Sequence, residues 1–446
     1  MNTPVCDFVK KYAESENARL HMPGHKGKGI LGFEHLDITE IEGADVLYSA
    51  TGIIKESMKN ASSLFSSSKT LYSTEGSSLS IRAMLYLTSL YAKEIGRPPL
   101  VLAGRNAHRA FLSGVALTDI EAEWITPAEN EGLLSCRITP RDLRAYLEKA
   151  KELPVALYVT SPDYLGNITD IKGLSAVCKE YGLLLLCDNA HGAYLNFLEE
   201  NHHPLTLGAD ICCDSAHKTL PVLTGGGYLH ISHSAPEVFK NQAESAMSLF
   251  ASSSPSYLIL QSLDMANRYM TEGYKEKFTA FCKKVNRLKE ALKEKGYTLT
   301  GDEALKITID AKKYGYEGNE LAEILYGKGI VCEFCDADFL VLMLSAENSD
   351  LDLTALESAL LSIDKKAEIL TNAPCIRVLE KALSIKEALM SQSVEVNAED
   401  SEGKILANYA ISCPPAVPIA VCGEIIDENA IKAFRYYGIE KIRIVK

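Results

Sequence analysis

Short apolar runs alternate with longer helical patterns between about residues 70 and 235. A continuous apolar run is typical of a strand that is buried on both faces, and its alternation with helices is typical of a parallel sheet covered by helices. The pattern therefore predicts an α/β fold with a mainly parallel sheet. Strands are expected at Leu100–Ala103, Ala156–Val159, Leu183–Cys187 and Ile211–Cys213, and a long helix at about 79–95.

The pattern changes near residue 270. Apolar residues recur there at helical spacing between lysines and glutamates, which predicts an amphipathic helix that leads into a smaller C-terminal α+β domain. These residues are Phe278, Phe281, Val285, Leu288 and Leu292. We predict a polar, irregular N-terminal arm at 1–45, a large domain at 46–270 and the small domain at 271–446. Within the small domain, residues 393–408 are polar and include Asn397–Gly403, which we expect to be an exposed loop, and Cys413–Glu424 is too rich in proline for a helix.

Composition narrows the range of partners. The 446 residues carry 46 Lys and Arg against 59 Asp and Glu, a net charge of −13, and so acidic a chain is a poor ligand for nucleic acids and anionic membranes. No apolar run approaches the about 20 residues of a membrane span, and we expect no secretory leader. Of twelve scattered cysteines, four lie in apolar or helical patterns, so we expect reduced thiols in a cytoplasmic protein. These four are Cys178, Cys187, Cys212 and Cys213.

Titratable residues follow each of the four predicted strands. Ligands of parallel sheets bind at the carboxyl ends of the strands, so these residues are candidates for a functional site. They are Arg105 and His108 after the first strand, Asp163 after the second, Asp188 and His191 after the third, and Asp214, His217 and Lys218 after the fourth.

Two groups suit an anion and a cationic ring. Gly76-Ser77-Ser78 opens the long helix, where backbone N–H groups, the helix dipole and two hydroxyls favour a phosphate, although an ordinary serine cap explains the same residues. Asp188 can pair with a protonated ring nitrogen, or it can cap a turn.

Two further groups suit an aldehyde and a flat ring. Lys218 directly follows a buried strand, where loss of solvation makes the amine a nucleophile, and Ser215 and His217 beside it can bind a phosphate; a solvated lysine is the alternative. His108 can stack on a ring or cap a helix. Together the four groups predict a cofactor with an aldehyde, a phosphate and a cationic heteroaromatic ring, which is pyridoxal 5′-phosphate.

At this point the chain resembles the short form of the bacterial ornithine/lysine/arginine decarboxylases, which are fold-type I, aspartate-aminotransferase-like pyridoxal-phosphate enzymes. The resemblance covers most of the chain, and its most specific motif is Ser215–Pro221. The other matching segments are His21–Gly27, Asp37–Glu40, Gly52–Ile54, Thr160–Pro162, Asp188–Gly192, Ser254–Tyr257 and the C-terminal Pro-Pro and Gly-Glu run.

The resemblance implies a role for each matching residue. Lys218 would bind the cofactor aldehyde and Asp188 the ring nitrogen, with His108 stacked on the ring and His191 beside it. The phosphate would be held by the loop that contains Gly76, by Ser77, Ser78, Ser215 and His217, and, from the neighbouring subunit of a homodimer, by Ser253 or Ser254. Residues 46–270 would be the cofactor-binding domain.

The implied reaction is decarboxylation of a basic L-amino acid, arginine or lysine before ornithine, an activity of polyamine metabolism. Asp163 and Glu424 are candidate partners for the distal cation of the substrate. The chain departs from the family pattern at Asn189, Asp163, Glu75, Gly225, Ala416-Val417 and Cys422. Two alternatives therefore stay open: an aminotransferase or another lyase, with Arg435 or Arg443 as carboxylate ligand, and a relative that binds the cofactor without turnover.

No metal site is predicted from the histidines. His21 and His25 are separated by Pro23-Gly24, which excludes a helix that would bring both to one face. His202-His203 lies in a polar loop, and we expect it to have no partner.

Overall fold

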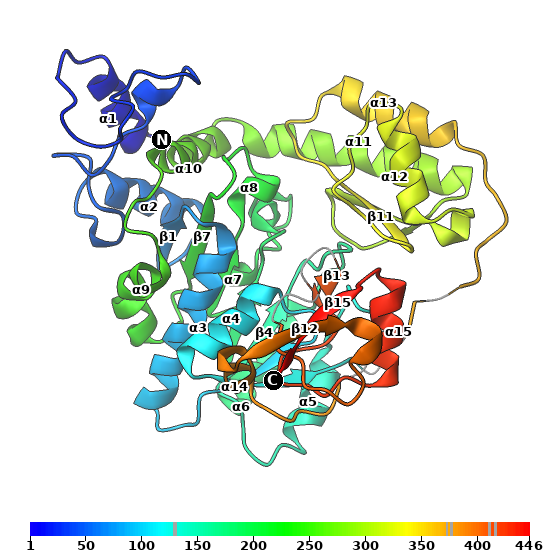
Figure 1. The fold of residues 1–446 in the computed structure, drawn as a ribbon. Helices are drawn as coiled ribbons and strands as arrows, with labels where there is room; N and C mark the ends of the chain where they lie inside the picture. The colour runs from blue at the N-terminus through cyan, green and yellow to red at the C-terminus, as the bar shows by residue number, and fades with distance from the viewer. Residues whose placement is uncertain (128–131, 372, 375–377, 409–411, 414–416) are drawn as a thin grey trace. The chain divides into compact units, whose positions relative to one another are not determined.

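The computed structural model describes residues 1–446 except 128–131, 372, 375–377, 409–411 and 414–416 (Figure 1). Pro414–Ala416, in the proline-rich segment, thus lies outside the described residues. Its flanks form two short paired strands, β13 (Ser412–Cys413) and β14 (Val417–Pro418), in agreement with the prediction that this segment is not helical. No helix in the described part of the chain is long and apolar enough to cross a membrane.

A seven-stranded sheet confirms the predicted α/β fold. Its order is β1-β7-β6-β5-β4-β2-β3, with β5 parallel to β6 and β2 parallel to β3, whereas β7 is antiparallel to both β1 and β6. The strands are β1 (Lys69–Ser73), β2 (Leu100–Gly104), β3 (Glu121–Ile125), β4 (Ala156–Thr160), β5 (Leu184–Asp188), β6 (Ile211–Asp214) and β7 (Gly227–Ile231). All four predicted strands are present and run one residue further, so Asp188 and Asp214 are the last residues of β5 and β6.

The chain divides into two compact units, each described by itself. Unit 1 comprises Met1–Pro99, Pro154–Tyr158 and Ile171–Glu276, and unit 2 comprises Leu100–Leu153, Val159–Asp170 and Lys277–Lys446. The three-part division predicted from the sequence stays a prediction.

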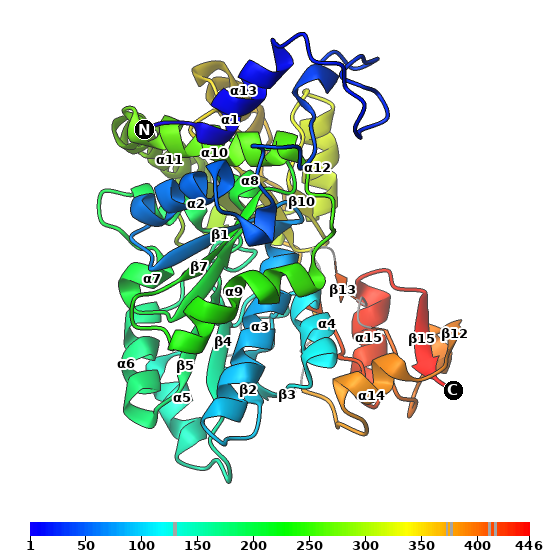
Figure 2. The ribbon, with the colours of Figure 1, turned by 90° about the vertical axis from the view of Figure 1, so that its left-hand side faces the viewer.

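The helices of unit 1 include α3, which corresponds to the predicted helix at 79–95 and begins at Gly76, the residue predicted to open it. Figure 2 shows α3 beside α9, with which it packs. The N-terminal arm is not wholly irregular, because Pro4 starts α1, whose Val5 and Val9 are buried. The helices are α1 (Pro4–Ala13), α2 (Ile53–Leu64), α3 (Gly76–Glu94), α6 (Ile171–Tyr181), α7 (Pro204–Leu207), α8 (Ala216–Thr219), α9 (Glu237–Phe250) and α10 (Tyr257–Thr271).

Unit 2 contains the predicted amphipathic helix, α11 (Tyr274–Lys295), which starts in unit 1 and buries all five predicted apolar residues. A four-stranded antiparallel sheet, in the order β10-β11-β9-β8, lies with α11, α12 and α13 (Figure 1). The strands of this sheet are β8 (Thr298–Thr300), β9 (Lys306–Asp310), β10 (Phe334–Cys335) and β11 (Phe339–Met343). The other helices of unit 2 are α4 (Arg109–Thr118), α5 (Pro140–Leu147), α12 (Gly318–Tyr326), α13 (Asp350–Leu361), α14 (Ile385–Met390) and α15 (Glu428–Tyr436).

The predicted loop Asn397–Gly403 follows a strand and is exposed except at Ala398 and Ser401, which are buried. In the polar residues before it, β12 (Ser393–Asn397) pairs with β15 (Lys441–Val445). The sequence Ser-Val-Glu-Val-Asn alternates with the period of a strand, and this alternation outweighs its polarity.

Candidate active site

The ends of β5 and β6 bring the central candidates together within unit 1. Asp188 is opposite Cys213 in the parallel register, so the residues after both strands emerge at one edge of the sheet. Lys218 lies in α8, directly after β6, and its Nζ is 2.9 Å from Nε2 of His191. The structure thus places Lys218 and His191, from two neighbouring strand ends, in hydrogen-bond contact.

Asp188 is a buried carboxylate with few donors around it. The Tyr158 hydroxyl donates to its Oδ2 at 3.0 Å, and the Ala190 N–H donates to its Oδ1 at 3.2 Å. Burial raises the pKa of Asp188, and the positive charge of Lys218 opposes this rise. Such a carboxyl group gains by contact with a further cation, because a cation stabilises its ionised form.

The start of α3 forms a cradle with donors for an anion. Gly76 has φ +68°, a conformation that favours glycine, and its N–H donates to the Gly225 carbonyl at 2.7 Å. Ser215 Oγ donates to Ser77 Oγ at 2.8 Å. Nδ1 of His217 donates to the Gly226 carbonyl at 2.9 Å, which leaves Nε2 for another partner. Burial lowers the pKa of His217, and a bound anion would act against this.

These residues fit pyridoxal phosphate. An ideal Cβ on Gly227 would lie 2.8 Å from the Asp214 carbonyl and 3.4 Å from the Ser77 N–H nitrogen, so β7 approaches the cradle closely only because glycine stands there. The buried Thr219 hydroxyl has no hydrogen-bond partner among the described residues. A lysine, a buried carboxylate and a cradle of hydroxyls at a helix N-terminus together match an aldehyde, a ring nitrogen and a phosphate.

Ser78 and Ser254 occupy different settings. Ser78 lies in the first turn of α3 and is half-buried. Ser254 is exposed before α10, and its N–H donates to Ser252 Oγ at 3.2 Å. Their predicted contacts with phosphate stay predictions.

Three predicted residues belong to unit 2. His108 is the N-cap of α4, where its Nδ1 accepts from the Ala110 N–H at 3.1 Å. Asp163 is buried, and its two oxygens accept from the N–H and the side-chain amide of Asn167. Glu424 is buried beside Arg105, with 3.1 Å between Oε2 and a guanidinium nitrogen. Burial raises the pKa of both carboxyl groups.

The proposed transaminase arginines, also in unit 2, already have partners. Arg435 pairs with Glu399 at 2.6 Å, and Arg443 donates to Ser393 Oγ at 2.9 Å. Both arginines are exposed. Their predicted role in binding a carboxylate stays a prediction.

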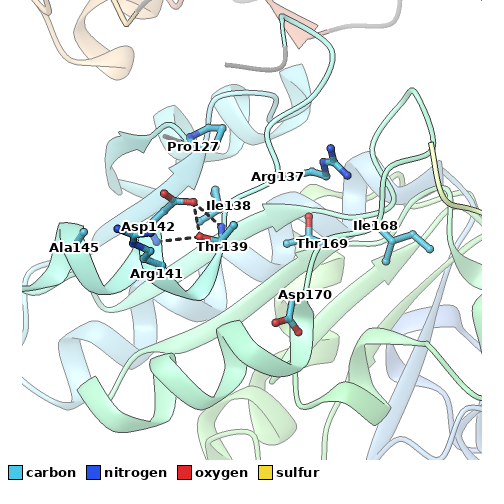
Figure 3. A pocket seen from close by; sticks show the side chains of 10 residues that line it. All are labelled: Pro127, Arg137, Ile138, Thr139, Arg141, Asp142, Ala145, Ile168, Thr169 and Asp170. Carbon is cyan, nitrogen blue, oxygen red and sulfur yellow. Dashed lines mark hydrogen bonds between the residues drawn. The ribbon is translucent and has the colours of Figure 1, made fainter. Parts of the chain in front are cut away.

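Unit 2 also contains a cavity of about 740 Å³ outside the predicted site (Figure 3). It is lined by residues around the start of α5 and by the segment after β4, among them Arg137, Arg141, Asp142 and Asp170. The Asp142 carboxylate turns to Thr139, where it completes the capping box of α5 (Figure 3). The side chains of Thr139 and Asp142 therefore cap the N-terminus of α5.

Sequence reasoning missed a buried cluster next to the candidate site. His203, expected in a polar loop without a partner, is fully buried, and its Nε2 donates to Asp214 Oδ2 at 3.1 Å. His230 donates to the same oxygen at 3.2 Å. The prediction for His203 is wrong because the loop before α7 turns inward. The alternation of Tyr228, Leu229 and His230 along β7 could have signalled that His230 faces a polar partner.

The four cysteines expected as buried thiols are confirmed. Cys178, Cys187, Cys212 and Cys213 are buried and free of disulfides.

Comparisons with known proteins agree with the predicted family. The family described as Orn/Lys/Arg decarboxylase, major domain, matches residues 3–311. The uncharacterized protein YaaO of Bacillus subtilis is 28% identical, with 97% of this chain and 93% of that protein covered, and an arginine decarboxylase of the same species is 27% identical, with 96% and 92% covered. The crystal structure of the lysine decarboxylase LdcF from Francisella novicida superposes with a TM-score of 0.78 at 16% identity, over 100% of this chain and 81% of that one.

The structural likeness establishes the fold, and the family match extends over most of the chain. The prediction of a fold-type I architecture is thereby confirmed. The chain belongs to the Orn/Lys/Arg decarboxylase family, and it is an amino-acid decarboxylase of the pyridoxal-phosphate-dependent kind.

Proposed function

We propose that the protein decarboxylates a basic L-amino acid, arginine or lysine before ornithine, with pyridoxal phosphate as its cofactor. The observation that carries this proposal is the contact of Lys218 Nζ with His191 Nε2, beside the buried Asp188 at the neighbouring strand end. When bound, the cofactor supplies an aldehyde for the amine of Lys218 or of the substrate, and a ring that accepts electrons from the breaking Cα–carboxylate bond.

In this proposal Asp188 holds a proton on the ring nitrogen. Its buried position gives the carboxylate a strong preference for a cationic partner, and Tyr158 fixes the orientation of Oδ2. Lys218 would hold the cofactor through its aldehyde, and His191, whose Nε2 is 2.9 Å from the Lys218 amine, would direct that amine. His108 would cover the face of the ring.

Hydroxyls and backbone N–H groups would bind the phosphate. Ser77, Ser78, Ser215 and the start of α3 offer neutral donors, and His217 offers Nε2. Ser254 is exposed, as expected of a residue that reaches the site of a second copy in a homodimer. We place this dimer in the cytoplasm, in line with the free thiols.

Glu424 is the better of the two proposed partners for the distal cation of the substrate. Its Oε1 is buried and has no hydrogen-bond partner among the described residues, whereas both oxygens of Asp163 are engaged by Asn167. A second cation would thus find an open oxygen on Glu424, although Arg105 already contacts the other. The relative named as an arginine decarboxylase supports a guanidinium substrate.

The test is to incubate the cofactor-loaded protein with arginine, lysine and ornithine separately and to identify the amine by mass spectrometry. We expect agmatine or cadaverine in larger amount than putrescine. Formation of a keto acid without an amine would replace this proposal by transamination. Absence of any product with the cofactor bound would leave a binding protein without turnover.

A further inference from the structure

Three fully buried side chains of unit 1 form a cluster that the proposed reaction does not use. They are His203, before α7, Asp214, at the end of β6, and His230, in β7. Both Nε2 atoms lie close to Asp214 Oδ2, at 3.1 and 3.2 Å, and all three atoms lie within 4.8 Å of one another. Two imidazole nitrogens and one carboxylate oxygen thus converge in the interior.

The strand register explains why the groups converge. Asp214 pairs with Tyr228, and His230 follows Tyr228 by two residues on the same strand. Because side chains alternate along a strand, Asp214 and His230 point to the same face of the sheet. Phe65 covers this face, with its ring centroid 5.4 Å from that of His203 and 4.5 Å from that of His230. The cluster is therefore shielded from water on a rigid support.

Outer hydrogen bonds orient two of the three groups. Nδ1 of His230 contacts Thr70 Oγ1 at 2.8 Å, and the Asn189 amide donates to Asp214 Oδ1 at 2.7 Å. These bonds leave Nε2 of His230 and Oδ2 of Asp214 directed at the shared point. Second-layer partners of this kind are typical of metal-binding histidines and carboxylates, because they fix the ring and the lone pair toward the ion.

Hydrogen bonds alone leave the cluster incomplete. Nδ1 of His203 is buried and has no hydrogen-bond partner among the described residues, so it is able to carry the ring proton when Nε2 binds an ion. A carboxylate between two neutral imidazoles also leaves a net negative charge in an apolar interior, which is costly without a counter-charge. A divalent cation at the shared point would supply that charge.

We propose that His203 Nε2, His230 Nε2 and Asp214 Oδ2 bind one divalent transition-metal ion of the zinc class. Two imidazoles and one carboxylate suit Zn²⁺, which takes nitrogen and oxygen ligands in tetrahedral geometry, here with a water as the fourth ligand. Ligand atoms bound to one such ion at about 2.0–2.2 Å lie roughly 3.2–3.5 Å apart, close to the two distances between nitrogen and oxygen in the cluster. The ion would tie β6, β7 and the segment before α7 together, behind the strand ends that carry Asp188 and Lys218.

The experiment measures zinc in the untagged, cofactor-loaded protein after incubation with Zn²⁺ and removal of free metal. We expect about one zinc per chain, and X-ray absorption at the zinc edge should show imidazole and oxygen neighbours without sulfur. The last point separates this site from zinc on thiols such as those of Cys332 and Cys335, which are partly accessible.

Variants assign the ligands. His203→Gln and His230→Gln should each lose most of the zinc, whereas His202→Gln, at the partly exposed neighbouring histidine, should keep it. A wild-type protein that retains less than a tenth of an equivalent of zinc, or that holds it through sulfur, overturns the proposal even if the buried variants fail to fold. Folded His203→Gln protein with wild-type zinc content overturns it as well.

Discussion

Asp188 and Asp214 end neighbouring strands, each preceded by a cysteine and each buried, yet their electrostatic surroundings are opposite. Burial raises the pKa of Asp188, and only Lys218 and hydrogen-bond donors such as Tyr158 oppose the rise. Burial would raise the pKa of Asp214 too, but His203 and His230 outweigh it and hold the pKa well below its usual range. Asp188 thus has few donors and one nearby cation, whereas Asp214 Oδ2 contacts two imidazoles.

The difference teaches that position at a strand end does not by itself define a reactive group. The Asp188 carboxylate lies near Lys218 of the candidate site, whereas the Asp214 carboxylate joins β6 to β7 and to the segment before α7. The hydrogen-bond and charge partners of a carboxylate determine its role. The partners of Asp214 are His203, 11 residues before it, and His230, 16 residues after it.

The largest effect is expected at Lys218, the group that distinguishes the Asp188 region. Lys218→Ala should lower kcat by about 10³-fold or more, because it removes the amine that is proposed to bind the aldehyde. The visible absorbance of the bound cofactor should be lost as well. Amine formation and absorbance spectra check this, with Lys172→Ala, at an exposed lysine of α6, as the control that should retain both. Turnover near the wild-type rate in Lys218→Ala would remove the basis of the assignment.

Asp188→Asn should separate function from stability. We expect kcat to fall by about 10²–10³-fold, because a neutral amide holds no proton on the ring nitrogen. The cofactor-free protein should unfold at the same or a higher urea concentration, because the substitution removes a buried charge and its amide can still bond to Ala190 and Tyr158. Strong destabilisation of the cofactor-free variant would contradict the contrast with Asp214.

Asp214→Asn is the reverse case. An amide oxygen can accept from both histidines, but the NH2 group of the amide then faces the Asn189 amide, which donates to Oδ1, and the negative charge is lost. The free energy of unfolding of the cofactor-free protein should therefore fall by about 3–5 kcal/mol. Urea denaturation at pH 7 measures this change. Asp350→Asn, at a surface carboxylate paired with Lys284, should change the free energy by less than about 1 kcal/mol. Equal stability of the two variants would mean that the buried cluster does not support the fold.

Local patterns were sufficient for much of the fold and of the Asp188 region. The continuous apolar runs located β2, β4, β5 and β6, because buried parallel strands need such runs along their whole length. Lys218 and His191 could be proposed because they directly follow two of these strands. Their 2.9 Å contact required the parallel register, which a single sequence does not specify.

The Asp214 region could not be predicted in the same way. His203 stands among polar residues and is buried through tertiary packing on Phe65, which no local pattern records. The helix in the N-terminal arm was not predicted for a related reason, since α1 buries only a few apolar residues.

A third buried carboxylate tests whether local donors can replace distant partners. Asp336 Oδ1 accepts from the N–H groups of Asp338 and Phe339, while Oδ2 has no hydrogen-bond partner among the described residues. Burial raises the pKa of Asp336 to about 6. The folded state therefore binds more protons than the unfolded state between about pH 4 and pH 6, and the contribution of this group to stability is lost as the pH rises through that range.

Asp336→Asn keeps an oxygen for both N–H donors and removes the charge. At pH 7.5 the variant should be more stable than the wild type by about 1–3 kcal/mol, and at pH 4.5 the gain should be smaller, because the wild-type carboxyl group is then largely protonated. Urea denaturation of the cofactor-free protein at the two pH values measures the difference. A variant less stable than the wild type at pH 7.5 would show that two adjacent N–H donors suffice to hold a buried carboxylate, and that the distant histidines of Asp214 are not what sets the two regions apart.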